Sequence, residues 1–152
     1  MSRREFTKVS PNLWRSRRFI GLTDAGKVLY AYLLTCEHQN STGCFRLPDG
    51  YACADLQWLS EKYAGARDEL VEADLIAIDL ELSLIFVRRW FKHSPPMNPK
   101  HAQGTVKQIS EIESDSIREI VEQEFADANG FHAAKPAPND ASRRSRLTDG
   151  LR

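Results

Sequence analysis

The sequence predicts an α+β fold, a winged helix-turn-helix with added C-terminal helices. Apolar residues recur at helical spacing over residues 23–36 and again over 59–70. Two short runs rich in β-branched and apolar residues, 75–80 and 84–88, follow directly. Helix, strand, two helices and a hairpin are the elements of a winged helix-turn-helix, and 152 residues are enough to give such a fold its own core.

The first strong helix is expected to begin at Thr23. Threonine is a good N-cap, and Asp24 places negative charge in the first turn, where the helix dipole favours it. One apolar stripe follows, made of Ala25, Val28, Leu29, Tyr32, Leu33 and Cys36. Turn-forming residues at 40–43 end this helix.

A short strand at 44–47 and two helices come next. Alternation before Pro48 indicates the strand, and residues 48–56 predict a short helix. Ser60 is expected to cap the third helix, whose core positions are Leu59, Tyr63, Ala66 and Leu70. Its opposite face is acidic and consists of Glu61, Gly65, Asp68 and Glu72.

The remaining segments divide the chain around a winged-helix domain at 23–93. Residues 1–22 are expected to be a basic N-terminal arm, with a short strand at 6–9, and residues 75–80 and 84–88 to form the hairpin, or wing. Prolines predict an extended linker at 94–104. Two helices are expected within 105–129, one over 105–112 and one from 114–116 to a stop at 129–130, followed by a disordered tail at 130–152.

The net charge is zero, but the charges are sorted into blocks. Residues 1–22 carry +5 and residues 88–108 carry +5, whereas residues 23–87 carry −7 and residues 109–129 carry −6. Local potential rather than total charge decides whether a polyanion is attracted. The two basic blocks are therefore the expected phosphate contacts, provided that the fold brings them together.

These considerations give a set of candidate DNA-binding residues. The third helix is the expected recognition element of a helix-turn-helix, although its acidic face repels phosphate. The candidates come from the arm, the third helix and the exit of the wing: Arg3, Arg4, Lys8, Arg15, Arg17, Arg18, Ser60, Lys62, Arg67, Arg88, Arg89 and Lys92.

Other chemistries are weaker interpretations of this sequence. Trp14, Trp58 and Trp90 could stack on bases, but each lies beside an apolar stripe, which favours core packing. The spacing of Cys36, Cys44 and Cys53 matches no common metal site, and an odd number of cysteines indicates a reducing compartment. No phosphate loop, nucleophile motif or carboxylate pair points to catalysis, so neither an enzyme nor a cofactor is expected.

An ordered set of motifs resembles a family of phage and prophage winged-helix proteins. The set includes Leu-Thr-Asp-Ala-Gly-Lys at 22–27, Tyr-Ala-Tyr-Leu-Leu-Thr at 30–35, Gly-Cys-Phe-Arg-Leu-Pro at 43–48, Asp-Leu-Gln-Trp at 55–58, Trp-Phe-Lys-His at 90–93 and Pro-Pro-Met-Asn-Pro at 95–99. These proteins are similar to the N-terminal domains of phage replication initiators and replisome organisers. The resemblance spans roughly residues 7–125. It implies binding to origin or operator DNA and, in longer members, recruitment of a replicative helicase or helicase loader.

The leading expectation is a homodimeric protein that binds double-stranded DNA in phage replication initiation. A transcriptional regulator is an alternative that the sequence does not separate from it. A protein-interaction module without DNA binding, such as a helicase adaptor or host-factor inhibitor, is a further alternative suggested by the acidic third helix. The N-terminus is charged without a following apolar stretch and no membrane span is expected, so the bacterial host cytosol is the expected compartment.

Overall fold

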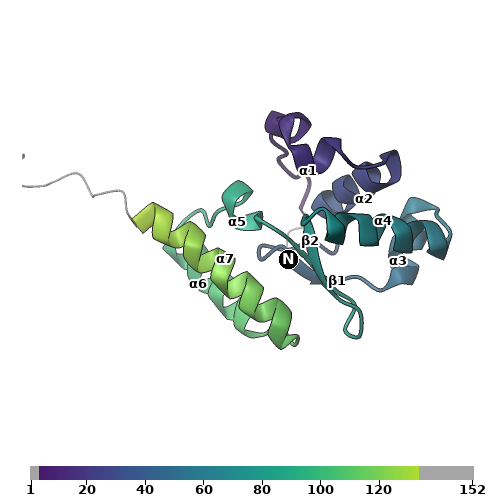
Figure 1. Ribbon diagram of the computed structural model, residues 1–152. Helices are drawn as coiled ribbons and strands as arrows, with labels where there is room; N and C mark the ends of the chain where they lie inside the picture. The colour runs from purple at the N-terminus through teal and green to yellow at the C-terminus, as the bar shows by residue number, and fades with distance from the viewer. Residues whose placement is uncertain (1–3, 134–152) are drawn as a thin grey trace, which may run out of the picture.

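The computed structural model describes residues 4–133 and has the predicted α+β class (Figure 1). Helices surround a small antiparallel sheet, with α2, α3 and α4 on one side and the α6–α7 pair on the other. In chain order the elements are η1 (a 3₁₀ helix, Pro11–Arg15), α1 (Arg17–Ile20), α2 (Asp24–Thr35), β1 (Cys44–Arg46), α3 (Asp49–Leu56), α4 (Ser60–Glu72), β2 (Ile76–Asp79), β3 (Leu84–Val87), α5 (Trp90–His93), α6 (Pro99–Ser110) and α7 (Asp115–Ala133).

The sheet has the strand order β1-β3-β2, so the last strand lies in the middle. Phe45 of β1 lies opposite Ile85 of β3, and Ala77 of β2 lies opposite Phe86. Ile85, Phe86 and Val87 are all buried, as expected for a central strand that is covered on both faces. The predicted hairpin is confirmed, and its tight connection places Ser83 in the left-handed region.

Helices α2 and α4 are tied together where α2 begins. Thr23 caps α2 as predicted, accepting a hydrogen bond from the Gly26 N–H. Glu69 of α4 then accepts hydrogen bonds from the Thr23 backbone N–H at 2.5 Å and from the Thr23 hydroxyl at 2.6 Å. A carboxylate at this position also favours the positive end of the α2 dipole. The two helices are thereby held in a fixed register.

Several predicted boundaries are wrong for identifiable reasons. Helix α6 begins at Pro99 rather than 105, because Asn98 caps it and proline is well tolerated at the first helical position. Helix α7 continues to Ala133, through the expected stop at 129–130 and into the segment assigned to a tail. Leu59, expected in the core, is 82% exposed and is itself the N-cap of α4, so Ser60 does not cap that helix. Residues 6–9 form no strand.

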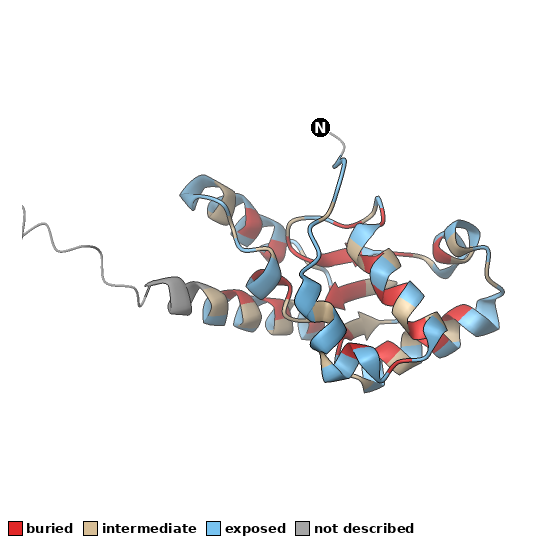
Figure 2. Ribbon diagram, turned by 90° about the horizontal axis from the view of Figure 1, so that it is seen from above, coloured by how far each residue is buried: buried red, intermediate tan, exposed pale blue. Residues whose placement is uncertain are grey.

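A single hydrophobic core joins segments that the sequence analysis treated separately (Figure 2). Phe19 and Leu22 bring the end of the expected arm into this core, so residues 1–22 are not a free arm throughout. Phe91 of α5 meets Phe125 of α7 edge-to-face, with ring centroids 5.0 Å apart. The proline-rich segment therefore connects two parts of one core. No helix within residues 4–133 is long and apolar enough to cross a membrane.

Candidate nucleic-acid interface

The N-terminal segment holds its arginines on the surface by burying the residues around them. Ser10 caps η1 by accepting from the Asn12 N–H at 3.2 Å, and Pro11 occupies the first turn. Phe19, at 3% exposure, anchors α1 against the domain. The cations that end η1 and begin α1 are all exposed: Arg15, Arg17 and Arg18.

The structure brings the two basic segments of the sequence to one groove. Residues of the N-terminal segment form one wall, and residues from the end of β3 through α5 form the other, enclosing about 260 Å³. The basic side chains along it are Lys8, Arg18, Arg88, Arg89 and His93. Its apolar lining includes Tyr30, Leu34, Leu75, Val87 and Trp90. No aspartate or glutamate is among the residues that line this groove. This arrangement meets the condition on which phosphate binding was predicted.

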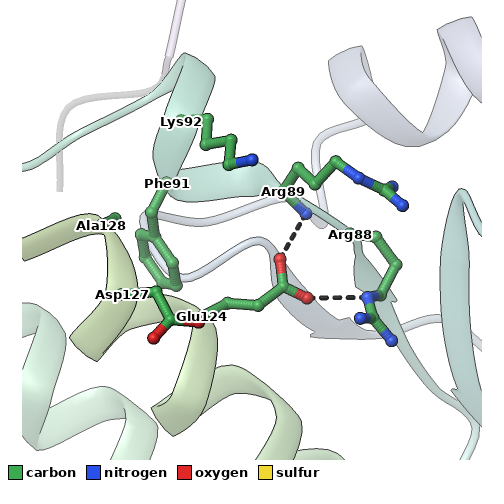
Figure 3. Close-up of a pocket in the computed structure, with 7 residues that line it drawn as sticks. All are labelled: Arg88, Arg89, Phe91, Lys92, Glu124, Asp127 and Ala128. Atoms are coloured by element: carbon green, nitrogen blue, oxygen red, sulfur yellow. Dashed lines mark hydrogen bonds and ion pairs between the residues drawn. The ribbon is translucent and has the colours of Figure 1, made fainter. Parts of the chain in front are cut away.

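Arg88 and Arg89 are also held by internal acidic partners (Figure 3). Glu124 of α7 reaches both, pairing with Arg88 Nε at 2.7 Å and accepting from the Arg89 backbone N–H at 2.5 Å. The Arg89 guanidinium donates to the carbonyl and the carboxylate of Asp74, at 2.8 and 2.6 Å. Asp74 and Arg89 both have left-handed backbones, with φ of 58° and 60°. These contacts fix the start of α5 and dock α7 onto it.

A second, mixed-charge hollow lies between α5 and α7 and encloses about 630 Å³ (Figure 3). It is lined by Phe91, Lys92 and Asp127 together with the Arg88–Arg89–Glu124 group. Sequence reasoning missed the acidic partners because Asp74 and Glu124 lie 15 and 35 residues from Arg89. No local pattern indicates pairs at such separations.

The third helix, α4, presents the acidic surface that was predicted. Glu61, Asp68 and Glu72 are all exposed. Arg67, predicted to contact DNA, is only 12% exposed at its side chain and pairs with Asp49 at 2.9 Å, so it is not available to a phosphate. Lys62 is exposed and lies 4.7 Å from the centre of the Trp58 ring. Apart from Lys62, the predicted contacts on this helix offer no accessible cation.

The cations of the N-terminal segment are the most accessible of the predicted set. Within residues 4–133, no ion pair holds Lys8, Arg15, Arg17, Arg18 or Lys92, and all are exposed. Arg4 donates to the Cys36 carbonyl at 3.2 Å, which fixes the chain ahead of η1. Arg3 lies outside the described residues.

The three tryptophans do not share one environment. Trp90 is buried as predicted, and its indole N–H donates to the Ser41 carbonyl at 3.1 Å. Trp58 is half-buried at the turn before α4. Trp14 is 68% exposed, so the prediction of core packing is wrong for this residue. It contacts buried Phe19 edge-to-face, at 5.4 Å between ring centroids, because η1 lies on the outside of the core.

The cysteines are free thiols in an apolar setting. Cys36 and Cys44 are buried and Cys53 is half-buried. Burial raises the pKa of Cys44 to about 12, and it also raises the pKa of Cys36. Buried thiols with raised pKa values behave as small hydrophobic groups. In the described part of the chain, no three His, Cys, Asp or Glu side chains gather as a metal site would require.

No protein-family model, no curated protein and no solved structure matches this chain.

Proposed function

We propose that this chain is a winged-helix protein that binds double-stranded DNA without catalysing a reaction. The order α2-β1-α3-α4-β2-β3 and the strand order β1-β3-β2 are compatible with a winged helix, in which β2 and β3 form the wing. The observation that carries the proposal is the meeting of exposed Lys8 and Arg18 with exposed His93 along a groove whose lining contains no carboxylate. Arg88 and Arg89 also line this groove, but their ion pairs with Glu124 and Asp74 leave the main phosphate contacts to the N-terminal segment.

The proposed binding mode relies on phosphate contacts more than on α4. Phosphate neutralisation supplies most of the affinity of non-specific DNA binding. Exposed Arg18, which lines the groove, and exposed Arg15 and Arg17, its neighbours in the chain, provide this neutralisation. An N-terminal segment of this kind can follow the minor groove of DNA. The acidic face of α4 is then expected to lie away from the backbone. Lys62 is the one predicted cation on α4 that we retain as a phosphate contact.

A low-salt binding titration with duplex DNA tests this mode. The double variant R17A/R18A should bind at least tenfold more weakly than the unaltered chain and should lower the slope of log K against log salt by about 1–2, roughly 0.9 for each lost contact. The matched control is K100A/K107A, which removes two exposed lysines from α6. Equal losses in the two double variants would refute the assignment of these N-terminal arginines as phosphate contacts.

The proposed biological role is initiation of phage or prophage DNA replication. This role is suggested by the resemblance of residues 7–125, which in longer members of the family implies recruitment of a replicative helicase or helicase loader, and we propose a homodimer. Footprinting that protects an origin supports this role, and protection of a promoter instead supports transcriptional regulation. The bacterial host cytosol is the compartment that this role requires.

The acidic face of α4 favours one second candidate, a protein-interaction module such as a helicase adaptor or host-factor inhibitor. Glu61, Asp68 and Glu72 form an exposed surface that suits a basic partner. The two functions differ in a simple measurement. A chain that shifts no duplex even at low salt, but captures a basic protein through this face, would have the second function.

A further inference from the structure

Three neighbouring aromatic rings lead from the core at α2 to the surface of the N-terminal segment. Tyr30 is buried and lies 5.8 Å from the Phe19 ring, and Phe19 lies 5.4 Å from Trp14. Trp14 is thus fixed on one side by a buried ring while 68% of it meets solvent. A large indole that is both held in place and uncovered is a ready stacking surface, since its ring needs no further ordering before a planar group binds.

Trp14 belongs to a wider exposed apolar surface. Phe6 is 70% exposed, and Val9 and Ile20 are each nearly half exposed, all within the same short segment. Single exposed apolar residues are ordinary, but four of them in 15 residues, two of them aromatic, form a cluster. The segment therefore offers apolar contact in addition to charge.

The charge around Trp14 is uniformly positive. Residues 6–23 include Lys8, Arg15, Arg17 and Arg18 and no acidic residue. Asn12 and Leu13 before Trp14, and Ser16 and Arg18 after it, line the basic groove. A planar base at Trp14 would accordingly have its flanking phosphates beside arginines, with the groove continuing toward Lys8.

We propose that this segment binds single-stranded nucleic acid, with a base stacked on Trp14 and the adjoining phosphates held by Arg15, Arg17 and Arg18. Alternating aromatic and basic side chains are the common means of binding single strands, because every base has a π face and every nucleotide a charge. Duplex DNA keeps its bases stacked on each other and offers Trp14 no face. The site thus adds a single-strand mode to the proposed DNA binding, and it rests on the same basic segment.

The competing occupant is an acidic peptide, which the arginines would also attract. The structure favours a nucleic acid because Trp14 is an exposed flat ring and the charged residues that follow it, Arg15, Arg17 and Arg18, are all exposed arginines, the combination that suits a base and its phosphates. Competition by an acidic peptide against the bound oligothymidylate distinguishes the two occupants.

The test measures binding of the full chain to a short oligothymidylate and to duplex DNA by fluorescence anisotropy. The variant W14A should bind the oligothymidylate about tenfold more weakly, the loss expected for one stacked base, while its duplex affinity changes less than twofold. W14F should recover part of the affinity because it keeps a ring. The matched control is Y51A, which removes a comparably exposed aromatic ring from α3 and should change neither affinity. Circular dichroism confirms that each variant is folded.

The possible results separate this inference from the proposed duplex binding. Unaltered binding of the oligothymidylate by W14A overturns the stacking site, as does a W14A loss that is equal for single strand and duplex. If the unaltered chain binds duplex DNA but not the oligothymidylate, the single-strand site is refuted and the proposed duplex binding is not. If the unaltered chain binds the oligothymidylate but not duplex DNA, the stacking site is supported and the proposed duplex binding is refuted. Competition of an acidic peptide for Trp14 at affinity above that of the oligothymidylate also overturns the inference.

Discussion

Removal of the Glu124 carboxylate should loosen α7 from the body of the protein. This carboxylate pairs with Arg88 Nε at 2.7 Å and accepts from the Arg89 N–H at 2.5 Å, and its side chain is 16% exposed. The hydrogen bond from the Arg89 N–H to this charged group contributes about 1.5–3 kcal/mol, and the ion pair with partly exposed Arg88 adds little to it. Asp74 stays near Arg88, at 3.8 Å, and solvent reaches part of the pair. We therefore expect E124A to lower the free energy of unfolding by about 2 kcal/mol in total.

Urea denaturation measures this loss, and the same helix supplies the control. With an m value of about 2 kcal/mol/M, the E124A midpoint should fall by about 1 M. Glu122 is exposed and makes only a 3.9 Å surface contact with Arg118. E122A should therefore cost no more than about 0.5 kcal/mol, and the change of helix propensity is the same in both variants. Midpoints that coincide for E124A and E122A would show that Glu124 does not hold α7 in place.

Two further predictions concern backbone space and ionisation. Gly43 has φ of 72°, and a Cβ there would lie 2.4 Å from Trp90 Cγ, so G43A should destabilise the fold by about 3 kcal/mol or more. A Cβ at Gly65 of α4 would meet open space, so G65A should stabilise the fold by about 0.5–1 kcal/mol. Thermal unfolding that shows equal shifts for the two variants would contradict this prediction. Burial raises the pKa of Cys44 from 9.0 to about 12, so the stability that this thiol contributes below pH 9 should be lost as the pH rises from 9 toward 12. The C44A variant should therefore lose less stability than the unaltered chain over that range. Identical profiles of unfolding free energy against pH would exclude Cys44 as a cause.

The sequence was sufficient for elements whose signals are local. Thr23 with the stripe through Leu33 predicted α2, and Tyr63, Ala66 and Leu70 predicted the buried face of α4. Both depend on residues a few positions apart, which helical geometry alone brings together. The central strand of the wing was likewise indicated by its run of apolar residues.

What the sequence did not predict depends on position in the fold. Pro99 looked like a helix breaker, but one residue later than an Asn cap it is a helix start. Trp14 and Leu59 looked like core residues, yet each lies where the chain passes the edge of the core. The ion pairs of Arg88 and Arg89 are made with Asp74 and Glu124, which are distant in the sequence, so charge blocks alone could not show that these arginines are already partnered.

The Phe91–Phe125 contact has a consequence for how this protein can be cut or recombined. Trimming the chain at residue 93 would strip Phe91 of its aromatic cover and leave Arg88 without Glu124. The smallest transferable unit therefore extends through most of α7. Any chimera or deletion series that treats the last two helices as a detachable extension should give aggregation-prone fragments instead of a smaller working protein.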